Sequence, residues 1–150
     1  MTYFIIKTER VFDYDPYYGC EILNEVAMKA LSPAINDSGT AKYVIAQLIS
    51  LLSHWSEKPG SEQLYYLNVS MPMINEEELI AVCFDSLIPL MKNDLQLIGF
   101  FINSIVSLER INSVYWNLPI KKRLNFLLSQ IPDGINSEDL RQLVRSFLTK

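Results

Sequence analysis

Residues 30–41 read ALSPAINDSGTA and join two segments whose apolar residues recur at helical spacing. Pro33 disfavours helical backbone at the residue before it, so the first segment should end there. Asn36, Asp37 and Ser38 each offer a side-chain oxygen that can cap the first amide groups of the next helix. The stretch therefore predicts a corner between two helices, and a helical fold around it.

The apolar spacing continues on both sides of this corner and predicts a bundle of about six helices. We expect an all-α fold in a single domain over residues 1–150, with at most a minor two-stranded β ribbon from residues 3–7 and 64–69. Pro89 should kink or end the third helix. The predicted helices cover, in order, residues 18–31, 37–55, 75–89, 94–114, 118–131 and 137–148.

The segment 94–114 is apolar almost all the way round its predicted helix. A helix without a polar face is buried on more than one side. It is therefore either the central helix of the bundle or a subunit interface.

Composition narrows the class of protein. The net charge of −4 gives no general attraction to nucleic acid or to an anionic membrane. The two cysteines, Cys20 and Cys83, lie inside apolar helical patterns, which suits free thiols in a reducing compartment. No signal peptide or transmembrane span is visible, so we expect this chain to be soluble and cytoplasmic.

Motifs that carry chemistry are scarce. The sequence has no Gly-x-Ser-x-Gly elbow, no glycine-rich phosphate loop and no Cys-x-x-Cys pair. His54 is the single histidine and lacks metal-ligand spacing to other residues. Residues 76–78 are three glutamates that suit a helix start, and residues 121–123 are a basic cluster that suits a solvated face. We therefore expect no catalytic residue, no metal site, no cofactor and no nucleic-acid partner.

The corner is the one place where polar side chains concentrate beyond what a turn requires. Its Asn and Asp residues are either helix caps and nothing more, or part of a polar pocket that nearby residues complete. Arg10 could pair with an aspartate there and hold the N-terminal segment over the corner. The candidate ligand-binding or interface residues are Arg10, Asp15, Lys29, Ser32, Asn36, Asp37 and Thr40.

The order of these residues resembles a bacterial family of predicted membrane proteins of unknown function (domain of unknown function 2254). The shared pattern is Arg10, Asp15-Pro16, an aromatic before Gly19, the run ALSP at residues 30–33, Ile35-Asn36-Asp37 and Thr40-Ala41. Ser38 and Tyr18 depart from it, because the family usually has proline and phenylalanine there. The resemblance implies transmembrane helices ahead of this region in family members and brings no known activity or ligand. It also implies that Arg10, Asp15, Asn36, Asp37 and Thr40 form one signature cluster.

Three hypotheses of function follow. The first is a non-enzymatic domain of a membrane protein, at the inner face of the membrane. It would act in regulation or self-association as a homo-oligomer through the helix 94–114, with a membrane-embedded segment of the same family as a further partner. The second is a small-ligand binding module at the corner around Asp37. The third, with least support, is a hydrolase that uses Asp15 or Asp37 as a base and Arg10 as an anion clamp.

Overall fold

A computed structural model describes residues 15–57, 75–131 and 138–149 of the chain. All the regular secondary structure in these ranges is helical, which confirms the all-α prediction. The two predicted strands lie outside the described residues. The helices are α1 (Pro16–Ala30), α2 (Ser38–Glu57), α3 (Glu76–Phe84), α4 (Ile88–Met91), α5 (Leu95–Ile111), α6 (Ser113–Gln130) and α7 (Glu138–Leu148).

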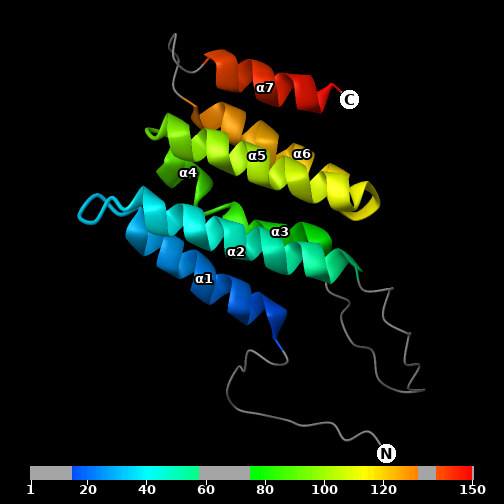
Figure 1. Cartoon of the computed structure of the whole chain (residues 1–150), viewed down its shortest axis with the longest axis horizontal. Coiled ribbons are helices and arrows are strands. Elements are labelled where there is room, and N and C mark those ends of the chain that lie inside the picture. Colours follow the sequence, from blue (N-terminus) through cyan, green and yellow to red (C-terminus); the bar gives the residue numbers. More distant parts are fainter. Residues whose placement is uncertain (1–14, 58–74, 132–137, 150) are drawn as a thin grey trace, which may run out of the picture.

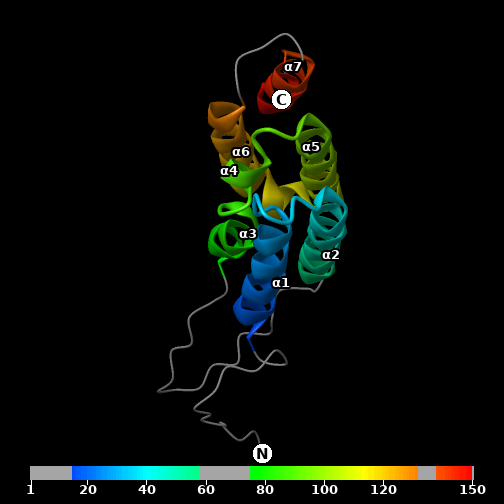
Figure 2. The same cartoon turned by 90° about the vertical axis from the view of Figure 1, so that its left-hand side faces the viewer.

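Five of the helices form a ring around a shared core. Going round it, α1 packs on α2, α2 on α5, α5 on α6, α6 on α3, and α3 on α1. Figure 1 shows these helices running roughly along the long axis of the molecule, and Figure 2 shows the ring close to end-on. The short α4 lies against α5 and α6, and α7 packs on the outer side of the same two helices.

Helix α5 occupies the central position that its apolar pattern allowed. It packs against α2, α4, α6 and α7, and its side chains from Leu97 to Leu108 include six buried apolar groups. The lack of a polar face is therefore explained by packing within the chain. Of the two alternatives for this helix, the structure shows the central one.

Three helix boundaries differ from those predicted, each for a local reason. The predicted helix 94–114 ends at Ile111, because the side chain of Asn112 accepts the amide of Tyr115 at 3.4 Å and starts α6 there. Helix α6 thus begins before residue 118 and contains Pro119. The third helix ends at Phe84, and Pro89 lies in the first turn of α4, where its missing N–H costs nothing.

Candidate functional site

The corner between α1 and α2 is held by backbone geometry. Asn36 adopts a left-handed conformation with φ of 49°, which asparagine tolerates better than most residues. The amide of Asn36 donates to the carbonyl of Ser32 at 2.9 Å, and the amide of Asp37 donates to the carbonyl of Ala30 at 2.8 Å. These bonds close the end of α1 and set the direction in which α2 leaves.

Asp37 caps the start of α2. Its Oδ1 accepts the amide of Thr40 at 3.0 Å, and its Oδ2 accepts the hydroxyl of Thr40 at 2.5 Å. The hydroxyl bond, with the nearby amides, lowers the pKa of the Asp37 carboxyl. Both carboxylate oxygens of this exposed side chain are therefore used in a local cap.

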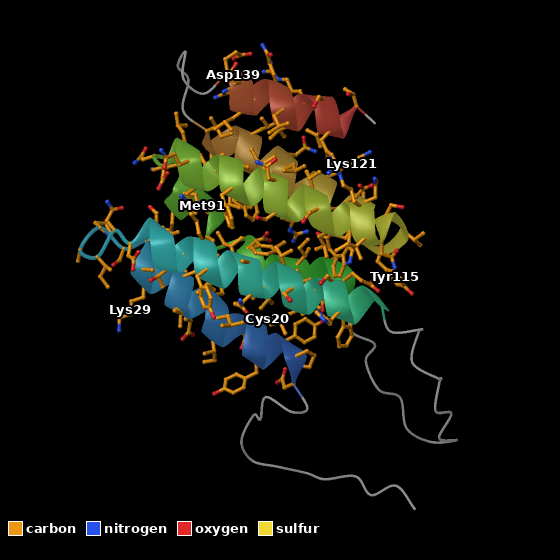
Figure 3. The ribbon with its side chains drawn as sticks, in the orientation of Figure 1. Cys20, Lys29, Met91, Tyr115, Lys121 and Asp139 are labelled. Atoms are coloured by element: carbon orange, nitrogen blue, oxygen red, sulfur yellow. The ribbon has the colours of Figure 1, made fainter. Side chains whose placement is uncertain are left out.

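Only part of the predicted cluster comes together. Ser32, Asn36, Asp37 and Thr40 lie at the corner, and the Lys29 side chain is exposed on the last turn of α1 beside it (Figure 3). Asp15 lies at the opposite end of α1, where it accepts the amide of Tyr18 at 3.0 Å. A helix of 15 residues is about 22 Å long, so Asp15 cannot share a pocket with the corner. Arg10 lies outside the described residues.

A contact that sequence reasoning missed joins the corner to the central helix. The Ser38 hydroxyl donates to Oδ2 of Asp94 at 2.5 Å, and Oδ1 of Asp94 accepts the amide of Leu97 at 2.9 Å. One carboxylate therefore caps α5 and anchors the start of α2. The Ser38 hydroxyl is the main cause that lowers the pKa of Asp94.

Arg123 on α6 was also misjudged from sequence, because it is only 6% exposed and does not belong to a solvated face. Its guanidinium donates to both oxygens of Asp85, at 2.9 and 3.0 Å, and also to Glu77. Burial works against the charged guanidinium, but the bonds to Asp85 and Glu77 outweigh it and raise the pKa of Arg123. The neighbouring Lys122 is exposed, as predicted, and pairs with Glu77 at 3.2 Å. The cluster therefore pins α6 to α3.

The glutamates at 76–78 and His54 have the structural roles that the sequence favoured. The glutamates form the first turn of α3, where Asn75 accepts the amide of Glu77 at 2.9 Å. His54 is exposed, and its Nδ1 lies 2.7 Å from the carbonyl oxygen of Ser50, one turn earlier on α2.

A hollow surface runs between α1 and α3. It consists of two open depressions of about 440 and 480 Å³ that share Glu21, Ala81 and Val82 as lining residues. The buried side chain of Asn24 fixes one wall to the other, since it donates to the carbonyl of Val82 and accepts the Ser86 hydroxyl at 2.9 Å. We call this surface the α1–α3 groove. Its lining also includes Asp15, Tyr17, Glu25, Met28, Glu78 and Asp85.

Exposed apolar side chains gather at the turn from α5 to α6. Val114 is 90% exposed and Leu118 is 64% exposed, with Ile111 and Tyr115 beside them also exposed. Figure 3 shows Tyr115 at the end of the bundle where this turn lies. We call residues Ile111, Val114, Tyr115 and Leu118 the tip stripe. Within α6, spacing of three and four residues places Val114, Tyr115 and Leu118 on one side of the helix, and Ile111 is the last residue of α5 before the turn.

Residues 15–57, 75–131 and 138–149 contain neither a metal-binding cluster nor a membrane-spanning helix. No group of three or more histidine, cysteine or acidic side chains there is arranged to hold a metal ion. No helix in that part of the chain combines the length and apolarity needed to cross a bilayer.

The fold thus defines a helical-bundle domain. The polar side chains of its corner cap α2 and bond α2 to the start of α5. The model of the family described as "Predicted membrane protein (DUF2254)" matches residues 1–107, and the chain belongs to this family. The family is uncharacterised. No curated protein and no solved structure matches the chain.

The family match stops inside α5, but the core does not. Helix α6 contributes Trp116, Ile120, Leu124 and Leu127, all with 0% exposure, to the same apolar cluster as α1 to α5. Arg123 adds the polar tie to α3. The part of the chain after residue 107 is therefore needed to close the ring of helices.

Proposed function

We propose that this chain is a non-enzymatic interaction domain of a membrane-associated protein, and that it acts by self-association. The observation that carries the proposal is the tip stripe, which packing among the described residues leaves exposed. Valine exposed to 90% and leucine exposed to 64%, side by side, are costly to keep in water. The apolar pattern of α5 gives self-association less support than the tip stripe does, because α5 packs against α2, α4, α6 and α7 within the chain.

The α1–α3 groove is the complementary surface that we assign to a second copy. Its floor includes Met28, Ala81 and Val82, while Glu21 and Glu25 border it with negative charge. The tip stripe has a net positive surround, because the cations Arg110 and Lys121 outnumber the anion Glu109 next to its apolar residues in the sequence. Apolar surface would thus meet apolar surface, with opposite charges at the rim.

This pairing is head to tail, since the stripe and the groove are different surfaces. A stripe-to-stripe pair across a two-fold axis would instead bring together two patches of the same net charge, which is less favourable. A head-to-tail contact builds rings or short chains. Burial of Val114 and Leu118 would contribute roughly 4 kcal/mol before the cost of association. The rest of the stripe and of the groove must supply the remainder, so we expect a weak contact that forms only at high micromolar concentration.

We propose that the domain lies at the cytoplasmic face of the membrane. There it would regulate a membrane-embedded segment of the same family. Free cysteines support a reducing compartment. The small-ligand hypothesis at the corner receives less support, because both oxygens of Asp37 already bond to Thr40.

Two variants test the proposal by sedimentation velocity over a concentration series. Val114→Asp destroys the stripe and leaves the groove, whereas Glu25→Lys reverses charge at the groove and leaves the stripe. Each variant alone should be monomeric at concentrations where the natural chain associates. A mixture of the two should restore a one-to-one dimer, because an intact stripe then meets an intact groove.

The control is Leu51→Asp, which changes an apolar residue that is 50% exposed on α2 and belongs to neither the tip stripe nor the groove lining. It should associate like the natural chain. A natural chain that stays monomeric at high micromolar concentration would refute self-association. Undiminished association of Glu25→Lys would refute the head-to-tail arrangement.

A further inference from the structure

The last helix, α7, has one continuous apolar side. Counted from Leu140, the positions three, four, seven and eight residues further along are all apolar, and the other positions of the helix are polar or charged. This spacing puts the apolar residues on one side of the helix. We call them the α7 stripe: Leu140, Leu143, Val144, Phe147 and Leu148.

The bundle covers the α7 stripe only in part. Val144 is the one buried residue of α7, whereas α5 buries six of its apolar side chains. Leu140, Phe147 and Leu148 are half-buried against the core, and Leu143 is 42% exposed. A surface helix of a bundle normally turns its apolar side to the core. Packing among the described residues therefore leaves this helix with apolar surface for a second partner.

Helix α7 lies outside the ring of five helices, on α5 and α6 (Figure 2). Leu140 approaches the backbone of α5 where a glycine makes room, because a Cβ added to Gly99 would lie 3.5 Å from Cδ2 of Leu140. Arg141 donates to the carbonyl of Ile131 at the end of α6. The contacts that close the ring do not include α7, so α7 can leave without opening it.

The charges of this last segment differ from those of the whole chain. The chain is acidic, but from residue 138 onward three cations, Arg141, Arg145 and Lys150, stand against two anions. Arg141 and Arg145 are four residues apart, so they lie on the same side of the helix. The Arg145 side chain is 60% exposed and pairs with Glu138 at 3.6 Å in solvent. A helix with one apolar side and with arginines on its polar side is the type that lies in the surface of a bilayer.

We propose that α7 is a membrane-binding helix, which leaves its position on α5 and α6 and lies in the surface of a bilayer that contains anionic lipid. The acyl chains would then cover all of the α7 stripe, of which the bundle fully buries Val144 alone. Arg141 and Arg145 would bond to lipid phosphates. The inference rests on the membrane setting proposed above and is independent of the contact between the tip stripe and the α1–α3 groove.

The test is flotation of the full-length chain with vesicles of phosphatidylcholine that contain about one third phosphatidylglycerol. The natural chain should float with these vesicles. It should bind less to phosphatidylcholine alone and less at high salt, because part of the attraction is electrostatic. Leu143→Asp should lower the partition onto the vesicles by at least about tenfold, because one leucine no longer enters the apolar phase.

Two further variants separate surface from release. Leu90→Asp is the matched control, because Leu90 on α4 is 41% exposed, almost as Leu143 is, and it should bind like the natural chain. In Gly99→Leu the larger side chain occupies the place of Leu140 and displaces α7 without changing it. This variant should bind vesicles about threefold more strongly, or more than that, because overpacking weakens the docked state. Urea unfolding verifies that each variant keeps a cooperative transition.

Four results would overturn the proposal. The natural chain does not float, or Leu143→Asp floats equally well, or Gly99→Leu binds no better than the natural chain. In the fourth, Val114→Asp loses binding and Leu143→Asp keeps it, which would make the tip stripe the membrane contact. The sedimentation experiments on self-association contain no lipid, and Leu143→Asp should associate in them like the natural chain. Failure of this inference is therefore distinguishable from failure of self-association.

Discussion

Removal of Asp85 should destabilise the fold more than removal of the arginine that it binds. The reason is that each substitution leaves a charged partner behind, and the two partners differ in how far they are buried. Asp85→Ala leaves the Arg123 guanidinium in a site where its side chain is 7% exposed, with Glu77 as its remaining partner. Arg123→Met instead leaves two carboxylates whose side chains are 31% and 45% exposed, which water can reach.

The magnitude follows from the contacts. Asp85 accepts two hydrogen bonds from the charged guanidinium, at 2.9 and 3.0 Å. Loss of one partner of a fully buried ion pair costs about 3–5 kcal/mol, and partial exposure of Asp85 reduces this to about 2 kcal/mol. For Arg123→Met we expect a loss of about 1 kcal/mol or less, since methionine retains much of the apolar stem.

The assay is urea unfolding followed by circular dichroism, with the slope of free energy against urea checked for constancy. Lys122→Met is the matched control, because Lys122 is 54% exposed and its pair with Glu77 lies at the surface. It should change the free energy of unfolding by less than about 0.5 kcal/mol. If Arg123→Met costs more than Asp85→Ala, the reasoning from uncompensated buried charge is wrong.

Two further predictions concern the central helix and the last helix. The folded-state pKa of Asp94 is lowered, so the stability that its carboxylate provides is present above the unfolded value of about 3.9 and is lost as the pH falls below it. Asp94→Asn should therefore be less stable than the natural chain at neutral pH, and urea titrations should show the difference shrinking in acid; a difference independent of pH would contradict this cause. Helix α7 has one buried residue, Val144, and within the described part of the chain it packs mainly on α5 and α6. Its backbone amides should therefore exchange their hydrogens with solvent faster than those of α5. Equal protection of the two helices would show that α7 belongs to the cooperative core.

Much of the fold could be predicted because its signals are local. A cap and the spacing of apolar residues lie within a few positions of each other, which is why the corner, Asn75 and the apolar segments predicted helices correctly. The break at Asn112 was missed, since the apolar pattern continues through it and only the cap geometry reveals two helices.

The candidate site was harder to predict, because nearness in the sequence is a poor guide to nearness along a helix. Asp15 and Asp37 seemed neighbours, yet α1 separates them by its whole length. Arg123 seemed one of three surface cations, yet its side of α6 faces α3.

The sequence by itself therefore determined the helical class, most helix starts and the corner at residues 30–41, because the helical period and the caps act over one or two turns. Tertiary structure alone decided that α5 is central, that Arg123 is buried against Asp85, and that Val114 and Leu118 are exposed among the described residues. The physical reason is that the side of each helix that becomes core is set by which helices surround it. That choice depends on contacts between distant residues.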